Sequence, residues 1–497
     1  MGGNYYIYDS INPLERIFID KLGYSATGFG WLNASYSVAA VLTLLIGGII
    51  IDRIGTKKAL TFFAVLCLLG AALTAARGHI GLMIAGRTVL GLGAETMIVA
   101  VTVALAKWFK GKELSFAFGI NLTVARLASV AADNSPTWAN RAFYPQGPSG
   151  EPSWQNPLLI AVGAGVLAVF CALIYWILET RAEGRYELGK GGAVDKIEFG
   201  NMFRIQFRQR FRIRGLAFKQ ALVQIGVAFW QCTVQIWRAV VEFLRFNRSY
   251  WYVVALCFTF YSAIFPFRTF AIDLFTNKIL TAHAGVAASE AIKQAGFCNS
   301  LLPFSAMIAT PLFGLMVDRI GKRALFMMLG SVLLMPVYLM MAYLSAAKTV
   351  TFAIPWFSAW HFTLEHVTLP VLLLVTMSMM GIAFSLIPAI MWPSVAYVVD
   401  QSRLGTAYAL MTMIQQIGFF MLNLLIGRAN DYSHAGLDNA GGYALGMWIF
   451  SILGFVGLTF AILLRIWGGG CRRRLRPQSV QRKDFEAASD GVSGRKR

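Results

Sequence analysis

The sequence predicts an all-α integral membrane protein with about twelve transmembrane helices, the first of them shortened. Three observations lead to this fold class. Of the 497 residues, 57% are hydrophobic and only 14% are charged, whereas soluble domains are about 45–50% apolar and about 25% charged. The few charges are clustered, so that long uncharged stretches lie between them. A motif from the first half of the chain also returns in the second half.

Apolar stretches long enough to span a bilayer follow one another along the chain. A helix needs about 20 residues to cross about 30 Å of hydrocarbon. Two stretches, 80–106 and 113–132, contain isolated charges, and nine contain none: 22–51, 59–76, 152–178, 249–267, 294–317, 324–347, 367–399, 404–427 and 439–464. The opening residues MGGNYYIYDSINPLERIF have only eight residues before Asp9 and lack a signal-peptide pattern. We expect them to form the second half of a first helix.

The net charge of +20 follows from topology and does not indicate nucleic-acid binding. If the spans alternate in direction, 33 of the 44 Lys and Arg residues fall on one side of the membrane. Eight fall on the other side, and Arg87, Arg126 and Arg268 lie within spans. Such an excess marks the cytoplasmic side. We therefore expect a multi-pass protein with cytoplasmic termini, the lipid bilayer as a partner, and no nucleic-acid partner.

Cysteine and histidine give no indication of an enzyme. Four of the six cysteines (Cys67, Cys171, Cys257 and Cys298) lie in apolar spans, and no CxxC pair occurs. The five histidines are scattered without metal-ligand spacing. We expect no metal site, no cofactor and no catalytic residues.

An internal repeat gives the architecture. GGIIIDRIGTKKA at 47–59 and FGLMVDRIGKRAL at 313–325 share the pattern Gly-x-x-x-Asp-Arg-Ile-Gly followed by basic residues. One copy could be an ordinary basic loop, but two copies at corresponding places indicate duplicated halves. The first glycine of each copy allows close helix approach and the second a tight turn. We expect gating roles for Gly48, Asp52, Arg53, Gly55, Gly314, Asp318, Arg319 and Gly321.

These two loops resemble the signature loop of the major facilitator superfamily. The resemblance implies two six-helix bundles, a central cavity and alternating access by rocking of the halves. The domains would be 1–178, a basic cytoplasmic connector at 179–249, 250–467, and a basic cytoplasmic tail at 468–497.

The last part of the connector has a helical pattern. Its polar residues recur at spacings of 4, 3, 4 and 3, namely at Gln231, Gln235, Arg238, Glu242 and Arg245. This predicts an amphipathic helix on the inner leaflet. A thirteenth span is the alternative.

Two charges are expected near the bilayer midplane. Glu95 lies twelve residues before Lys107, about 18 Å along its helix, and Arg126 lies thirteen after Glu113, about 20 Å along the next. Buried charges of this kind face a partner or a wet cavity. Glu95 and Arg126 could pair with each other, or they could form a divided site for a zwitterion. We expect Arg87 near the outer interface and Arg268 as an outer-edge anchor.

A closer resemblance is carried by GRTVLGLGAET, AKWFKGKELSFAFGINLTVAR, MWPSVAYVV and LGTAYALM. These segments look like the lysosomal dipeptide transporter branch of the superfamily. The resemblance implies that Glu95 holds the peptide's amino group and Arg126 its carboxylate, that Tyr8 and Trp392 line the cavity, and that transport is uniport. The long connector and the lack of an N-x-S/T acceptor in 133–156 favour a plasma-membrane relative, as in bacteria, with a lysosomal location if the source is eukaryotic.

The sequence thus predicts a secondary transporter of small zwitterionic solutes, most simply dipeptides. A proton-coupled symporter with Glu95 as the carrier, and a drug–proton antiporter, are the alternatives. LER at 14–16 lacks the ExxER spacing of proton-dependent peptide symporters, and INLTVARLASVAADNSP lacks the Gly-Pro signature of antiporters. A receptor or scaffold would leave the two midplane charges unexplained.

Overall fold

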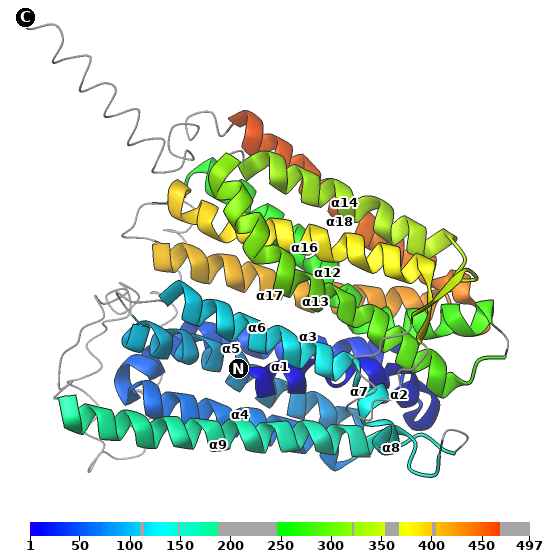
Figure 1. The fold of residues 1–497 in the computed structure, drawn as a ribbon, viewed down its shortest axis with the longest axis horizontal. Coiled ribbons are helices and arrows are strands. Elements are labelled where there is room, and N and C mark those ends of the chain that lie inside the picture. The colour runs from blue at the N-terminus through cyan, green and yellow to red at the C-terminus, as the bar shows by residue number, and fades with distance from the viewer. Residues whose placement is uncertain are drawn as a thin grey trace, which may run out of the picture.

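The structure is a computed structural model that describes residues 1–109, 114–147, 150–186, 246–283, 285–320, 323–352, 367–399 and 404–467. Long helices dominate it and run roughly along its longest dimension (Figure 1). They form two groups that lie side by side, which we call the N-half (1–186) and the C-half (246–467).

The N-half begins with a broken helix. Its elements are α1 (Gly2–Asp9), η1 (Asn12–Leu14), α2 (Glu15–Leu22), α3 (Ala26–Ile54), α4 (Thr56–Ala76), α5 (Ile80–Phe109), α6 (Leu114–Asp133), the short α7 (Ser135–Trp138) and α8 (Asn140–Phe143), and α9 (Gln155–Tyr186). Local chemistry sets several boundaries. Gly23 ends α2 in the left-handed conformation, and Ser25 caps α3 by accepting a hydrogen bond from the Gly28 amide at 3.0 Å.

The C-half repeats the pattern of long helices. Its elements are α12 (Arg248–Ala282), α13 (Ala288–Ile320), α14 (Arg323–Tyr343), β1 (Thr349–Phe352), β2 (Val367–Pro370), α16 (Val371–Val398), α17 (Leu404–Tyr432), η4 (Ala440–Tyr443) and α18 (Ala444–Trp467). Strands β1 and β2 pair antiparallel, with Thr349 opposite Pro370. The sequence analysis did not predict this hairpin.

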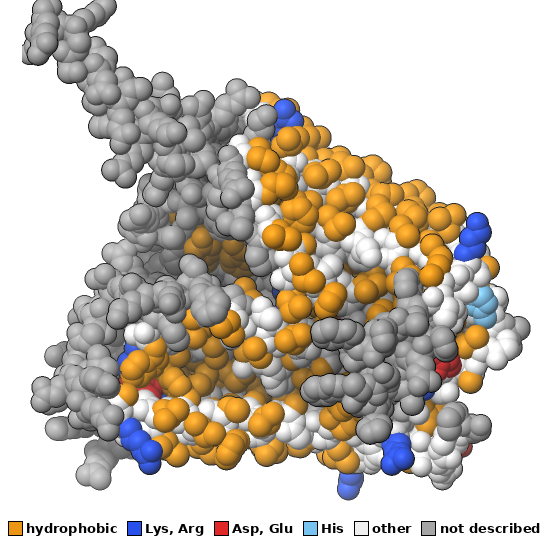
Figure 2. Space-filling view, viewed as in Figure 1, with side chains coloured by type: hydrophobic (Ala, Val, Ile, Leu, Met, Phe, Trp, Pro, Cys, Tyr) orange, Lys and Arg blue, Asp and Glu red, His pale blue; other side chains and the backbone are white. Residues whose placement is uncertain are grey.

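Each of the eleven predicted spans coincides with a long helix. In the described parts of the chain, eight helices have the length and apolar composition needed to cross a bilayer. Large apolar side chains are exposed on the outer face of α9, where Val166, Leu167 and Phe170 are 54–61% exposed. Figure 2 shows hydrophobic side chains over both halves, with most Lys and Arg toward the edges. Such a surface suits a lipid environment.

The two ends of the molecule differ. We call the end that carries α2, α7, α8 and the β1–β2 strands the hairpin end, and the opposite end, from which α9 leaves and α12 begins, the connector end (Figure 1). The predicted amphipathic helix at 231–245 and the tail at 468–497 lie outside the described residues.

The halves touch closely toward the hairpin end. Helix α3 packs on α17, and α6 packs on α13. A Cβ added to Gly427 of α17 would lie 2.6 Å from the carbonyl oxygen of Ala26 in α3, so only glycine allows this approach. The Phe29 ring of α3 meets the Phe270 ring of α12 with centroids 5.9 Å apart. The described residues therefore form a closed interface at this end.

Candidate functional site

Glu95 lies midway along α5 and is held by one neutral group from each half. The Tyr36 hydroxyl of α3 donates to Glu95 Oε1 at 3.0 Å, and Gln416 Nε2 of α17 donates to the same oxygen at 3.1 Å. A single carboxylate oxygen thus joins the N-half to the C-half at mid-depth.

Arg126 of α6 lies against aromatic faces. Its guanidinium carbon is 5.2 Å from the Phe384 ring centroid in α16 and 5.9 Å from that of Tyr5 in α1. Contacts of this kind attract a cation to the ring face. Within the described part of the chain, no carboxylate lies within 4 Å of Arg126. Arg126 and Glu95 are not an ion pair in this structure.

Tyr8 connects Glu95 to a buried arginine. The Tyr8 ring packs edge-on against the ring of Tyr36, with centroids 4.7 Å apart, and the Arg87 guanidinium lies 5.0 Å from the Tyr8 centroid. Tyr8 therefore lies one aromatic ring away from Glu95. Tyr5, which contacts Arg126, precedes Tyr8 by about one helical turn. Helix α1 places both tyrosines near the two charges.

Trp392 lies in an aromatic group of the C-half. Its indole nitrogen donates to the Tyr261 hydroxyl at 2.9 Å, and its ring stacks on Tyr408 with centroids 5.7 Å apart. Tyr261 also meets Phe384 edge-on at 6.2 Å. Because Phe384 lies against Arg126, the Trp392 group is linked to the arginine through two rings and does not contact it directly.

Arg87, which the sequence analysis expected near the outer interface, is buried inside the protein. It is 1% exposed. Its Nη2 donates to Asn33 Oδ1 at 2.5 Å, and its Nη1 donates to the carbonyl oxygens of Ile7 and Tyr8 at 3.4 and 3.2 Å. The broken end of α1 exposes carbonyls that this guanidinium satisfies, and so the side chain turns inward instead of snorkelling.

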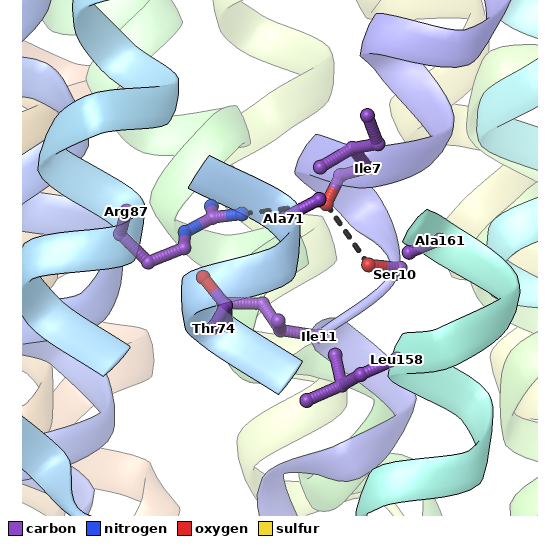
Figure 3. A pocket seen from close by; sticks show the side chains of 8 residues that line it. All are labelled: Ile7, Ser10, Ile11, Ala71, Thr74, Arg87, Leu158 and Ala161. Carbon is purple, nitrogen blue, oxygen red and sulfur yellow. Dashed lines mark hydrogen bonds between the residues drawn. The ribbon is translucent and has the colours of Figure 1, made fainter. Parts of the chain in front are cut away.

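A small cavity beside Arg87 is too small for a substrate. Its volume is about 10 Å³, room for about one water molecule. Figure 3 shows Arg87 and Ser10 pointing toward the Ile7 carbonyl. Its lining comprises Ile7, Ser10, Ile11, Ala71, Thr74, Arg87, Leu158 and Ala161.

Arg268, which the sequence analysis expected to be an outer-edge anchor, is also buried. It lies in α12 with its side chain 3% exposed and bridges to the N-half. Its Nη2 is 2.7 Å from Asp133 Oδ2 at the end of α6, and its Nη1 is 3.6 Å from Asp9 Oδ2 at the end of α1. Helix α12 continues fifteen residues past 267, to Ala282, so Arg268 lies inside the helix and between the halves.

Most of the predicted gating residues cannot be placed. Gly55 has φ +81°, a conformation that favours glycine, and it forms the turn between α3 and α4. The side chains of Asp52, Arg53, Asp318 and Arg319, the surroundings of Gly48 and Gly314, and residue Gly321 lie outside what the structure describes.

The turn after Gly55 is anchored to α9. Lys57 Nζ lies 2.6 Å from Glu183 Oε2, and Lys107 Nζ pairs with Glu183 Oε1 at 2.9 Å and with Glu179. These lysines join α4 and α5 to the connector end of α9.

Several contacts were missed by sequence reasoning. They involve Tyr5, Tyr36, Gln416 and Phe384 at the two central charges, and Asp9 and Asp133 at Arg268. Buried arginines within spans were a usable signal for Arg87 and Arg268. Nothing in the sequence marks the neutral partners of Glu95, because tyrosines and glutamines occur on many helix faces.

Curated relatives share most of the chain. It is 28% identical to "Lysosomal dipeptide transporter MFSD1" of Danio rerio over 436 residues, covering 86% of this chain and 78% of that protein. The protein of that name from Homo sapiens is 26% identical, covering 86% and 77%.

Solved structures share the fold. The nucleoside transporter NupG aligns with a TM-score of 0.59 at 12% identity, covering 94% of this chain and 97% of that one. A bacterial homologue of the human drug peptide transporters PepT1 and PepT2 aligns with a TM-score of 0.61 at 14% identity, covering 95% and 96%. The family model described as Major Facilitator Superfamily matches residues 2–421. The predicted fold class is confirmed: this chain belongs to the Major Facilitator Superfamily and is a multi-pass secondary membrane transporter.

Proposed function

We propose that this transporter moves small zwitterionic solutes, dipeptides in particular, by alternating access and without a coupling ion. The observation that carries the proposal is the pair of opposite charges on α5 and α6, Glu95 and Arg126, which do not neutralise each other and are each contacted by the C-half. The names of the curated relatives support a dipeptide as the solute.

Each charge suits one end of a peptide. The Glu95 carboxylate would accept hydrogen bonds from the peptide ammonium. The Arg126 guanidinium would grip the peptide carboxylate with two parallel charge-assisted hydrogen bonds. Its contacts with the Phe384 and Tyr5 rings are cation–π contacts, and such contacts do not neutralise the guanidinium as a carboxylate would. A dipeptide separates its charged ends by about 7 Å, so the two ends need two separate partners, as a divided site provides.

The same contacts suit a moving site. Glu95 and Arg126 belong to the N-half, whereas Gln416 and Phe384 belong to the C-half. A bound peptide would replace these contacts between the N-half and the C-half. Its binding would therefore change the relative stability of the conformations in which the two halves are held together. We propose that the hairpin end faces the outside or the lumen, because the basic loops lie at the other end. The domain limits and the Tyr8 and Trp392 cavity roles stay predictions.

Peptides with blocked ends test the divided site. Arg126→Lys should weaken binding of free dipeptides much more than of C-terminally amidated ones. Glu95→Gln should weaken free dipeptides more than N-acetylated ones. Loss of a charged partner in a dry site costs about 2–5 kcal/mol, a factor of tens to thousands in affinity. Binding would be measured by titration in detergent or nanodiscs.

Exposed residues of the same type serve as controls. Glu290→Gln removes a carboxylate that is 52% exposed, and Arg141→Lys changes an exposed arginine. Both should bind every peptide as the wild type does. Equal losses for free and blocked peptides in Arg126→Lys and Glu95→Gln would contradict the divided site.

Proton-coupled symport is the second candidate, since Glu95 is a carboxylate in a site shared by both halves. In proteoliposomes, a uniporter equilibrates a labelled dipeptide and gains no accumulation from an imposed pH gradient. Accumulation above equilibrium that is driven by acidification and lost in Glu95→Gln would favour the symporter.

A further inference from the structure

Two carboxylates from different halves are buried together toward the hairpin end. Glu15 is the first residue of α2, beyond the first span, and is 1% exposed. Asp273 lies in α12 and is 5% exposed. Helices α2 and α12 pack against each other. Burial, and after it the negative charge of Asp273, raise the pKa of the Glu15 carboxyl well above its ordinary value.

Both carboxyl groups retain an oxygen without a partner among the described residues. Glu15 Oε2 and Asp273 Oδ1 are buried and accept no hydrogen bond from them. The other oxygen of Asp273 accepts from the Tyr443 hydroxyl of η4, which in turn accepts from Asn277 Nδ2 at 2.6 Å. A neutral donor therefore satisfies one oxygen of Asp273, while Glu15 Oε2 and Asp273 Oδ1 stay without a partner among the described residues.

The charged groups that face this pair do not neutralise it. Arg16 on α2 is a cation whose charge reaches both carboxyl groups, but its Nε is engaged with Asp20 at 3.0 Å, and Asp20 adds a negative charge near Asp273. Asp431 at the end of α17 adds a further negative charge, although the Ala26 and Thr27 amides bind its two oxygens at 2.8 Å. In the part of the chain that the structure describes, no Lys or Arg lies within 4 Å of Glu15 or Asp273.

The two buried carboxylates at Arg268 differ from Glu15 and Asp273 because a cation pairs with them. Asp9 and Asp133 are as deeply buried, but a guanidinium lies between them. Isolated carboxylates taken out of water become neutral instead of remaining charged, and two that share a site do not both ionise. A metal ion is a poor occupant here, because the described residues contain no group of three His, Cys, Asp or Glu that could hold one.

We infer that Glu15 and Asp273 form a proton-binding site between the halves, occupied when the hairpin end is closed. The proton joins Glu15 Oε2 or Asp273 Oδ1, the two free oxygens. This inference rests on the proposed alternating access, because opening the hairpin end separates α2 from α12 and exposes both carboxyl groups to water. They then lose the proton at neutral pH.

The direction of the pH effect follows from the different exposure of the carboxyl groups in the closed and open states. The pKa of the Glu15 carboxyl is higher in the closed state, where it is buried, than in the open state, so protons favour closure. Closure is strongest at low pH on the hairpin side and is lost as the pH rises through the closed-state pKa. The closed-to-open ratio then changes by up to about tenfold per pH unit for one linked proton.

Distance measurements across the hairpin end test the site in the full-length protein. Spin labels on Ala76→Cys at the end of α4 and Ala288→Cys at the start of α13, both exposed, report closure in nanodiscs once the native cysteines are replaced. In the wild type, the short-distance population should grow from pH 8 to pH 5. In Glu15→Gln, and independently in Asp273→Asn, it should be large at both pH values. Glu151→Gln, which removes a carboxylate that is 83% exposed, should respond as the wild type does.

The outcomes separate this inference from the proposed function. A wild type without pH dependence, or a Glu15→Gln protein that keeps the full dependence, would overturn the proton site. Should Glu15→Gln fail to fold, Asp273→Asn decides in the same way. Dipeptide uptake is measured on the same preparations. Peptide transport with a pH-insensitive distance refutes the proton site alone, whereas a pH-sensitive distance without transport of any dipeptide refutes the proposed function alone.

Discussion

Replacing Arg268 by glutamine should open the hairpin end and destabilise the protein. The substitution removes the guanidinium that lies 2.7 Å from Asp133 Oδ2 and 3.6 Å from Asp9 Oδ2, and it leaves both carboxylates buried at 0–3% exposure. Breaking a buried ion pair by removing one partner costs about 3–5 kcal/mol. Because the bridge joins the two halves, this cost falls on the closed state in full.

The expected shift is large enough to measure in two ways. A cost of about 3–5 kcal/mol changes the closed-to-open ratio by about two to three and a half orders of magnitude. The Ala76–Ala288 distance distribution should therefore move to the open population, and the apparent melting temperature in detergent should fall. Adding Asp133→Asn to Arg268→Gln should recover part of both losses, because one of the two stranded buried charges is then removed.

A surface pair provides the control. Lys293 lies 3.5 Å from Glu290 on α13, and its side chain is 26% exposed. Lys293→Gln should cost no more than about 1 kcal/mol. If Arg268→Gln behaves like Lys293→Gln in both assays, Arg268 is not a bridge between the halves and the reasoning fails.

Three further predictions concern the turns and the ends of helices. Asp431→Ala removes the carboxylate that caps the first amides of α3 at 2.8 Å. The free energy of unfolding should fall by about 1–2 kcal/mol, measured by thermal unfolding. An unchanged melting temperature would show that the cap is dispensable. Gly55→Ala forces a side chain into φ +81° and should cost about 1–3 kcal/mol, again by thermal unfolding; a neutral result would mean that the turn adapts. Asp52→Asn and Asp318→Asn should each lower the dipeptide turnover number with little effect on folding. Unchanged uptake rates in both variants would show that the repeated motif has no gating role and only marks the cytoplasmic loops.

The sequence by itself determined the membrane spans, because hydropathy is a local property and each span must satisfy its own backbone hydrogen bonds in lipid. The eleven apolar stretches became helices, and Gly55 became the turn that the repeated motif predicted. Residue counting also placed Glu95 midway along α5 and Arg126 inside α6, since the rise per residue of a helix is fixed; their depth in the bilayer stays a prediction.

Only the tertiary structure decided which side chains meet. Counting along a helix gives depth but not the neighbouring helix that a residue faces, and this depends on the packing of all the helices together. For that reason Arg87 and Arg268, expected at the outer edge, proved to be buried connections between elements. The neutral partners of Glu95 come from α3 and α17, 59 and 321 residues away along the chain. The unneutralised Glu15 and Asp273 pair arises only because α2 packs against α12 across the two halves.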